Sequence, residues 1–291
     1  MSGHCAARGS DVNERNDRRP ARPQDARSTQ GATGRGDRRG DGGAAPRDRS
    51  TDGDGDRRPR RVEPDLPEDA TSAELDRRVR AELTSLAALN AEAVARHLVM
   101  AGRLLDEDPD AAYAHAVAAR DRAGRVGAVR AAVGIAAYRS GRYAECLAEL
   151  RAARRISGDQ SLLPVMADCE RGLGRPEKAL AMASSAEAGT LDAEGRAEML
   201  IVASGARRDL GQPAAAALLL QGPDLQPGHR RAWSARLFYA YADALLAAGR
   251  ADEGTQWLAR AAEADEAGET DAAERLAELD GVRFLEAPDE T

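Results

Sequence analysis

The stretch AAYRSGRYAECLAEL, residues 136–150, decides the fold of this chain. A helix-like run leads to a turn at Gly141, an aromatic residue follows two positions later, and small and large apolar residues then recur at helical spacing. Two interpretations are open for this stretch: part of an active site, or one unit of a repeating scaffold. A scaffold would show the same pattern elsewhere in the chain.

The pattern recurs three times toward the C-terminus. Its turn glycines, Gly141, Gly174, Gly211 and Gly249, are 33, 37 and 38 residues apart. In each copy a helix is expected to end at the glycine, and a second helix to begin near a Tyr, Pro or Ala two positions on. Periods of this length are typical of stacked helical hairpins. The spacing therefore predicts an all-α helical-repeat fold.

The copies resemble the tetratricopeptide repeat (TPR), a helix-turn-helix unit with small residues where its two helices cross. The matching positions are Gly134, Ala137, Gly141, Tyr143 and Cys146 in the first copy, Ala167, Gly174 and Ala179 in the second, Gly211 in the third, and Ala242 and Gly249 in the fourth. The third copy departs from the pattern because the prolines and glycines of QGPDLQPG shorten its second helix. The resemblance implies a right-handed TPR-like solenoid over about residues 94–268.

Composition separates residues 1–65 from the rest of the chain. They contain no Phe, Trp, Tyr, Ile or Leu, and they carry 15 arginines against 12 acidic residues. Such a segment buries too little apolar surface to offset its chain entropy, so a disordered Arg/Asp/Gly/Pro-rich tail is expected. The remaining residues carry 27 basic against 37 acidic side chains. The chain thus resembles actinobacterial TPR proteins that place their repeats behind an Arg/Gly-rich leader.

Residues 66–291 are expected to form the TPR-like repeat domain, with a capping helix at each end. Thr71 and Glu74 have capping-box spacing, and apolar residues at helical steps predict a helix from there to about Asp106. Pro109 suits the first turn of the next helix, which should stop at Gly124. The polar stretch DAAERLAELDG, residues 271–281, is expected to cap the other end.

No motif in the sequence indicates an enzyme. The one lysine, Lys178, does not stand in a phosphate-binding loop, and no metalloprotease or nucleophile-elbow motif occurs. His97 and His115 would meet across one hairpin, but two lone imidazoles are more often core or surface residues than metal ligands. We therefore expect no catalytic residue, metal or cofactor. No apolar run reaches the length of a membrane span, and a cytoplasmic protein is expected.

The resemblance also implies a concave groove lined by the first helix of each hairpin. Transferring the groove-facing positions onto the copies gives Tyr138, Arg139, Asp168, Arg171, Arg208, Tyr239 and Asp243. Arginine and tyrosine are well suited to anchoring a peptide. The positions that would grip a C-terminal carboxylate hold Ala131, Ile135, Pro164 and Asp168, which does not favour a chaperone-type clamp. The alternative is that these are ordinary exposed polar residues.

Two functional hypotheses follow. The first is a non-enzymatic protein–protein interaction scaffold that binds a protein or peptide in the groove. The second is an RNA-associated adaptor whose tail makes weak nucleic-acid contacts without sequence preference. Interleaved aspartates and the lack of aromatic residues in the tail count against the second.

Overall fold

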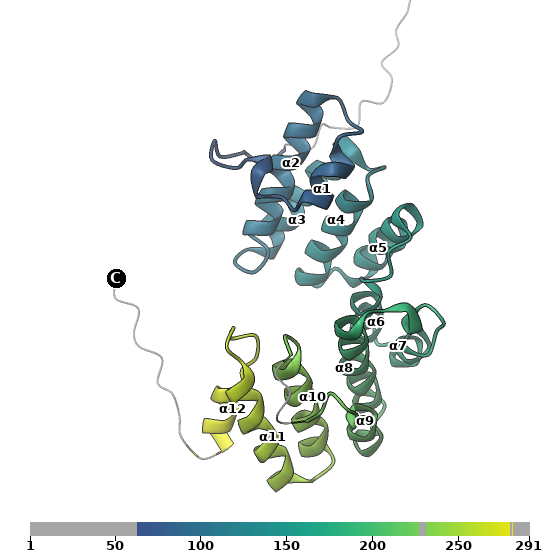
Figure 1. Cartoon of the computed structure of the whole chain (residues 1–291), viewed down its shortest axis with the longest axis vertical. Helices are drawn as coiled ribbons and strands as arrows, with labels where there is room; N and C mark the ends of the chain where they lie inside the picture. The colour runs from purple at the N-terminus through teal and green to yellow at the C-terminus, as the bar shows by residue number, and fades with distance from the viewer. Residues whose placement is uncertain (1–62, 227–230, 280, 282–291) are drawn as a thin grey trace, which may run out of the picture. The chain divides into compact units, whose positions relative to one another are not determined.

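The computed structural model describes residues 63–226, 231–279 and 281. Backbone contacts divide the chain into residues 1–58 and 59–291, and the description concerns the second unit. Its described residues form twelve α-helices and two short 3-10 helices, and no strand (Figure 1). The all-α class predicted from the sequence is confirmed for this part of the chain.

The helices follow one another with short connections. Their bounds are α1 Arg77–Leu83, α2 Ala88–Arg103, α3 Pro109–Ala123, α4 Gly127–Arg139, α5 Tyr143–Ser157, α6 Leu163–Gly172, α7 Pro176–Ala183, α8 Ala193–Asp209, α9 Pro213–Leu220, α10 Ser234–Ala247, α11 Ala251–Ala264 and α12 Ala272–Leu279. The 3-10 helices are Ser72–Glu74 and Ala188–Thr190.

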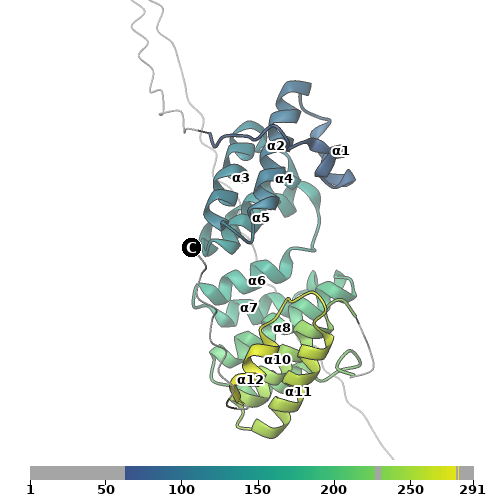
Figure 2. The same ribbon diagram turned by 90° about the vertical axis from the view of Figure 1, so that its left-hand side faces the viewer.

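Helices that are neighbours in the chain pack in pairs. The pairs are α2 with α3, α4 with α5, α6 with α7, α8 with α9, and α10 with α11. The first helix of each pair also contacts the first helix of the next pair, so that α2, α4, α6, α8 and α10 form an unbroken series of contacts. Figures 1 and 2 follow this order from the α1 end to α12. The described part of the chain is therefore repeat-like in its packing.

Four of the hairpin turns share one backbone conformation. Gly141, Gly174, Gly211 and Gly249 have φ of 73°, 70°, 71° and 76°, a region that favours glycine. In each turn the N–H after the glycine donates to a carbonyl five residues earlier: Arg142 to Ala137, Arg175 to Glu170, Gln212 to Arg207, and Arg250 to Leu245, over 2.7–3.0 Å. This bond is characteristic of the Schellman motif, which satisfies the last carbonyls of a helix.

The α2–α3 hairpin lacks this glycine turn and uses a different connection. The Asp108 carboxylate accepts a hydrogen bond from the Ala111 N–H (2.9 Å), and Pro109 occupies the first turn of α3. Helix α3 ends at Ala123, with Gly124 as its C-cap. Both ends of α3 therefore lie where the sequence predicts them.

The N-terminal helix expected from about Thr71 to Asp106 is wrong in its continuity. The Thr71–Glu74 capping box is present, but it starts a single 3-10 turn. Between α1 and α2, the hydroxyls of Thr84 and Ser85 donate to the carbonyls of Ala81 (2.7 Å) and Glu82 (2.9 Å). Such local side-chain bonds compete with the helical pattern, and the chain turns there.

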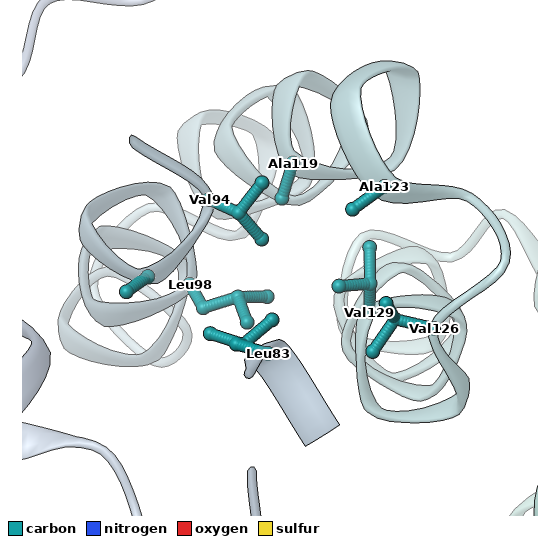
Figure 3. Close-up of a cluster of buried hydrophobic side chains, with 8 residues drawn as sticks. Leu83, Val94, Leu98, Ala119, Ala123, Val126 and Val129 are labelled. Atoms are coloured by element: carbon teal, nitrogen blue, oxygen red, sulfur yellow. The ribbon is translucent and has the colours of Figure 1, made fainter. Parts of the chain in front are cut away.

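The break lets α1 fold back over its neighbours. Figure 3 shows apolar side chains from α1, α2, α3 and the start of α4 pointing toward one another. The labelled residues of this cluster are Leu83, Val94, Leu98, Ala119, Ala123, Val126 and Val129, and all are buried. A straight helix over residues 71–106 would have carried Leu83 away from this cluster, so burial favours the broken form.

The small residues matched to the TPR motif are buried where helices pack. These residues are Gly134, Ala137, Cys146, Ala167, Ala179 and Ala242. Small side chains allow two helices to approach closely, and larger neighbours such as Leu150 and Leu258 then fill the remaining space. Helix α9, whose shortening was predicted, ends at Leu220, and α12 packs against α11.

Candidate functional site

The seven side chains predicted to line a groove all lie on first helices of the hairpins. Tyr138 and Arg139 belong to α4, Asp168 and Arg171 to α6, Arg208 to α8, and Tyr239 and Asp243 to α10. Because these helices contact one another in series, their side chains meet across the helix interfaces.

Arg171 is the centre of the first group. Its guanidinium donates to Asp168 Oδ1 (2.6 Å) on its own helix and to Asp209 Oδ2 (2.8 Å) and Oδ1 (3.3 Å) at the end of α8. The Tyr138 hydroxyl of α4 donates to the other oxygen of Asp168 (2.5 Å). One polar network thus joins α4, α6 and α8.

Gly205 of α8 makes room for this network. A β-carbon at position 205 would lie 2.5 Å from Cζ of Arg171, which is too close for the observed guanidinium position. The sequence analysis missed Gly205. Its one signal was a glycine inside a helix, where glycine is unfavourable unless close packing requires it.

The electrostatics of this group keep each partner in the form that its hydrogen bonds require. Burial and the Asp168 carboxylate raise the pKa of Tyr138 well above its usual value, so the phenol stays protonated and donates. Burial alone would lower the pKa of Arg171, but Asp209 and Asp168 outweigh it and raise that pKa. The network is therefore charged and fully paired at neutral pH.

The remaining predicted residues form other contacts. Arg208 donates to Asp243 (2.8 Å), and Arg275 of α12 donates to both Asp243 (2.5 Å) and the Tyr239 hydroxyl (2.6 Å). Arg139 pairs with Asp106 in the α2–α3 connection. The structure therefore brings Arg208, Tyr239 and Asp243 into a second group, separate in its contacts from Tyr138, Asp168 and Arg171.

A cleft of about 630 Å³ adjoins the first group, and we name it the Arg171 cleft. Its lining combines apolar and charged side chains. The lining residues are Tyr138, Arg139, Ser161, Pro164, Val165, Asp168, Arg171, Asp192, Glu194, Gly195, Glu198, Ile201, Val202 and Arg236. Four of the seven predicted groove residues line this cleft, and Arg208, Tyr239 and Asp243 do not.

The sequence analysis missed the side of the Arg171 cleft formed by α8 and α10. Arg236 of α10 pairs with Glu198 (2.7 Å) and Glu194 (3.4 Å) of α8, and with Glu269 after α11. These partners are 33 to 42 residues from Arg236 in the chain. Nothing in the local sequence distinguishes them from other charged residues on helix surfaces.

A second polar cluster lies between α2 and α3. His97 and His115 are both buried, and their Nδ1 atoms are 3.1 Å apart, so one ring donates to the other. A carboxylate oxygen of Glu63 lies 3.9 Å from Nε2 of His97 and 2.6 Å from an Arg122 nitrogen. The folded unit therefore includes Glu63, although the sequence analysis places it in the tail.

Cys146 and Cys169 lie in one buried core cluster between α5 and α6. A hydrogen bond with Cys146, together with burial, raises the pKa of Cys169, which keeps its thiol protonated. Among the described residues, no group of three or more His, Cys, Asp or Glu side chains is placed to hold a metal ion.

Residues 1–62 lie outside the described residues, so both the predicted disordered tail and the RNA-adaptor hypothesis stay predictions. Within the described part, each helix is too short or too polar to cross a membrane. The chain matches no protein-family model, and comparison with curated proteins yields no match.

Proposed function

We propose that this protein is a non-enzymatic interaction scaffold whose TPR-like hairpins bind a protein or peptide in the Arg171 cleft. The carrying observation is that cleft: a concavity of about 630 Å³ on the first helices, with charged side chains beside an apolar part. Concave sites with an apolar lining and a few oriented polar groups are typical of ligand binding.

The first-helix contacts support a role in recognition. Tyr138, Asp168 and Arg171 are held by hydrogen bonds to one another, so their side chains lose little further freedom when a partner binds. The apolar residues Val165, Ile201 and Val202 supply surface that a partner would cover.

Affinity capture with a cleft variant tests the proposal. We expect full-length protein to retain a partner that Ile201→Arg loses, because an arginine at this position would fill the apolar part of the cleft. Leu218→Arg is the control, since Leu218 lies on α9 with 67% of its surface exposed and does not line the cleft. Equal recovery by both variants, each with wild-type helicity, would contradict the proposal.

A further inference from the structure

The charges of the Arg171 cleft are unequal. Its lining holds three arginines, Arg139, Arg171 and Arg236, and four carboxylates, Asp168, Asp192, Glu194 and Glu198. Acidic side chains bordering the cleft, Asp106, Asp209 and Glu269, pair with the same arginines. The cleft and its border are therefore rich in carboxylates.

Each arginine of the lining is already engaged by a carboxylate. Arg171 pairs with Asp168 and Asp209, and Arg236 pairs with Glu194, Glu198 and Glu269. An incoming carboxylate would have to displace one of these partners and would face the others as like charges. The lining thus disfavours an acidic ligand.

A guanidinium meets the opposite situation. The Glu194 side chain is 53% exposed, and its one ion pair, with Arg236, spans 3.4 Å. Arg236 distributes its donors over three carboxylates, which leaves acceptor capacity on Glu194 for a second cation. Asp192 lies two residues away at the N-cap of α8 and adds a second carboxylate to the same end of the cleft.

The apolar part of the cleft fits the rest of an arginine side chain. Pro164 and Val165 of α6 and Ile201 and Val202 of α8 belong to the lining. An arginine can lay its methylene stem along apolar surface while its charged group reaches a carboxylate. A ligand with several arginines would use both features together.

From this complementarity we infer that the Arg171 cleft binds an extended peptide carrying arginines. The ligand's guanidinium groups pair with Glu194 and Asp192, and their stems contact the apolar residues of α6 and α8. This inference rests on the proposed function and adds the chemistry of the partner. Because the cleft is open to solvent, the affinity should fall as salt screens the charges.

Fluorescence anisotropy with labelled nonapeptides tests the inference on the full chain. The probes alternate alanine with arginine, with citrulline, or with glutamate; citrulline keeps the shape of arginine without its charge. We expect saturable binding of the arginine peptide, at least about tenfold weaker binding of the citrulline peptide, and none of the glutamate peptide. Equal binding of the arginine and citrulline peptides would overturn the inference.

A matched pair of variants separates the cleft from the general negative charge of the protein. Glu194→Gln should weaken binding of the arginine peptide about three- to fivefold, whereas Glu253→Gln should leave it unchanged. Both glutamate side chains are 53% exposed and each pairs with one arginine, but Glu253 lies on α11 and does not line the cleft. An equal loss for both variants would mean general charge attraction and would overturn the inference.

The same assay distinguishes this inference from the proposed function. If the citrulline or glutamate peptide binds and Ile201→Arg abolishes that binding, the cleft is a peptide site and only the preference for arginine is wrong. If no probe binds in an Ile201-dependent way and affinity capture also shows no difference for Ile201→Arg, the proposed function itself fails.

Discussion

Leu150 of α5 lies directly over Gly134 of α4, at the crossing of the two helices. A β-carbon on Gly134 would lie 2.6 Å from Cγ of Leu150, much closer than van der Waals contact allows. Leu150 is fully buried and has little room to move. The absence of a side chain at position 134 therefore sets how closely α4 and α5 approach.

Replacing this glycine should destabilise the fold. Gly134→Ala forces the helices apart, and overpacking of this kind costs about 1–3 kcal/mol. In thermal unfolding this corresponds to a lower Tm, by about 2–4 °C per kcal/mol. The control is Gly102→Ala in α2, where a β-carbon has no neighbour within 4 Å. It should leave stability unchanged or raise it by up to about 1 kcal/mol, so equal losses would contradict the assignment of the crossing.

The turn at Gly141 should depend on backbone conformation alone. Its φ is 73°, and a β-carbon there would meet nothing within 4 Å. Gly141→Ala should therefore cost about 1–2 kcal/mol from the left-handed conformation, and Gly141→Asn should cost less because asparagine tolerates that conformation. Urea unfolding of the two variants measures the difference. Equal costs would point to side-chain crowding instead.

Arg171 and Gly205 should be coupled in stability. Arg171→Ala removes the ion pairs to Asp168 and Asp209 and should cost about 1 kcal/mol, a modest value because the side chain is 27% exposed. Gly205→Ala should destabilise the wild type by displacing the guanidinium. In the Arg171→Ala protein the same change should stabilise by about 0.5–1 kcal/mol, because the space is empty and alanine favours a helix. A double-mutant cycle in urea checks this, and additive effects would be inconsistent with the contact.

The His97–His115 pair should make the fold sensitive to mild acid. Burial lowers the pKa of both imidazoles below the ordinary value of 6.5; for His97 the neighbouring His115, Arg122 and Arg96 lower it further, and Glu63 opposes them. As the pH falls below about 6.5, the unfolded chain binds protons that the folded chain refuses. Stability should therefore be complete above that pH and decline below it, by up to about 1.4 kcal/mol per pH unit for each imidazole.

Denaturant unfolding between pH 7.5 and 5 checks this dependence. The range avoids most carboxylate titration. The double variant His97→Leu with His115→Leu removes both imidazoles from the buried site, and we expect its stability to change much less over this range. A slope equal to that of the wild type would place the acid sensitivity elsewhere.

Much of the fold was predictable because its signals are local. The turn glycines, Pro109 and the small crossing residues each restrict the backbone or the helix approach within a few residues, and their spacing repeats. The break between α1 and α2 was missed because the helical periodicity runs through it. The bonds of Thr84 and Ser85 to the preceding carbonyls, and the burial of Leu83 against α2 to α4, decide that region.

The sequence by itself determined an all-α chain of hairpins, because helix periodicity and glycine turns are properties of short segments. The tertiary structure alone decided which charged residues meet. Arg171 and Asp209 are 38 residues apart, as are Arg236 and Glu198, and each helix surface carries many other charged residues. Only the placement of α6, α8 and α10 against one another selects these pairs, because ion pairing depends on distance in space and not along the chain.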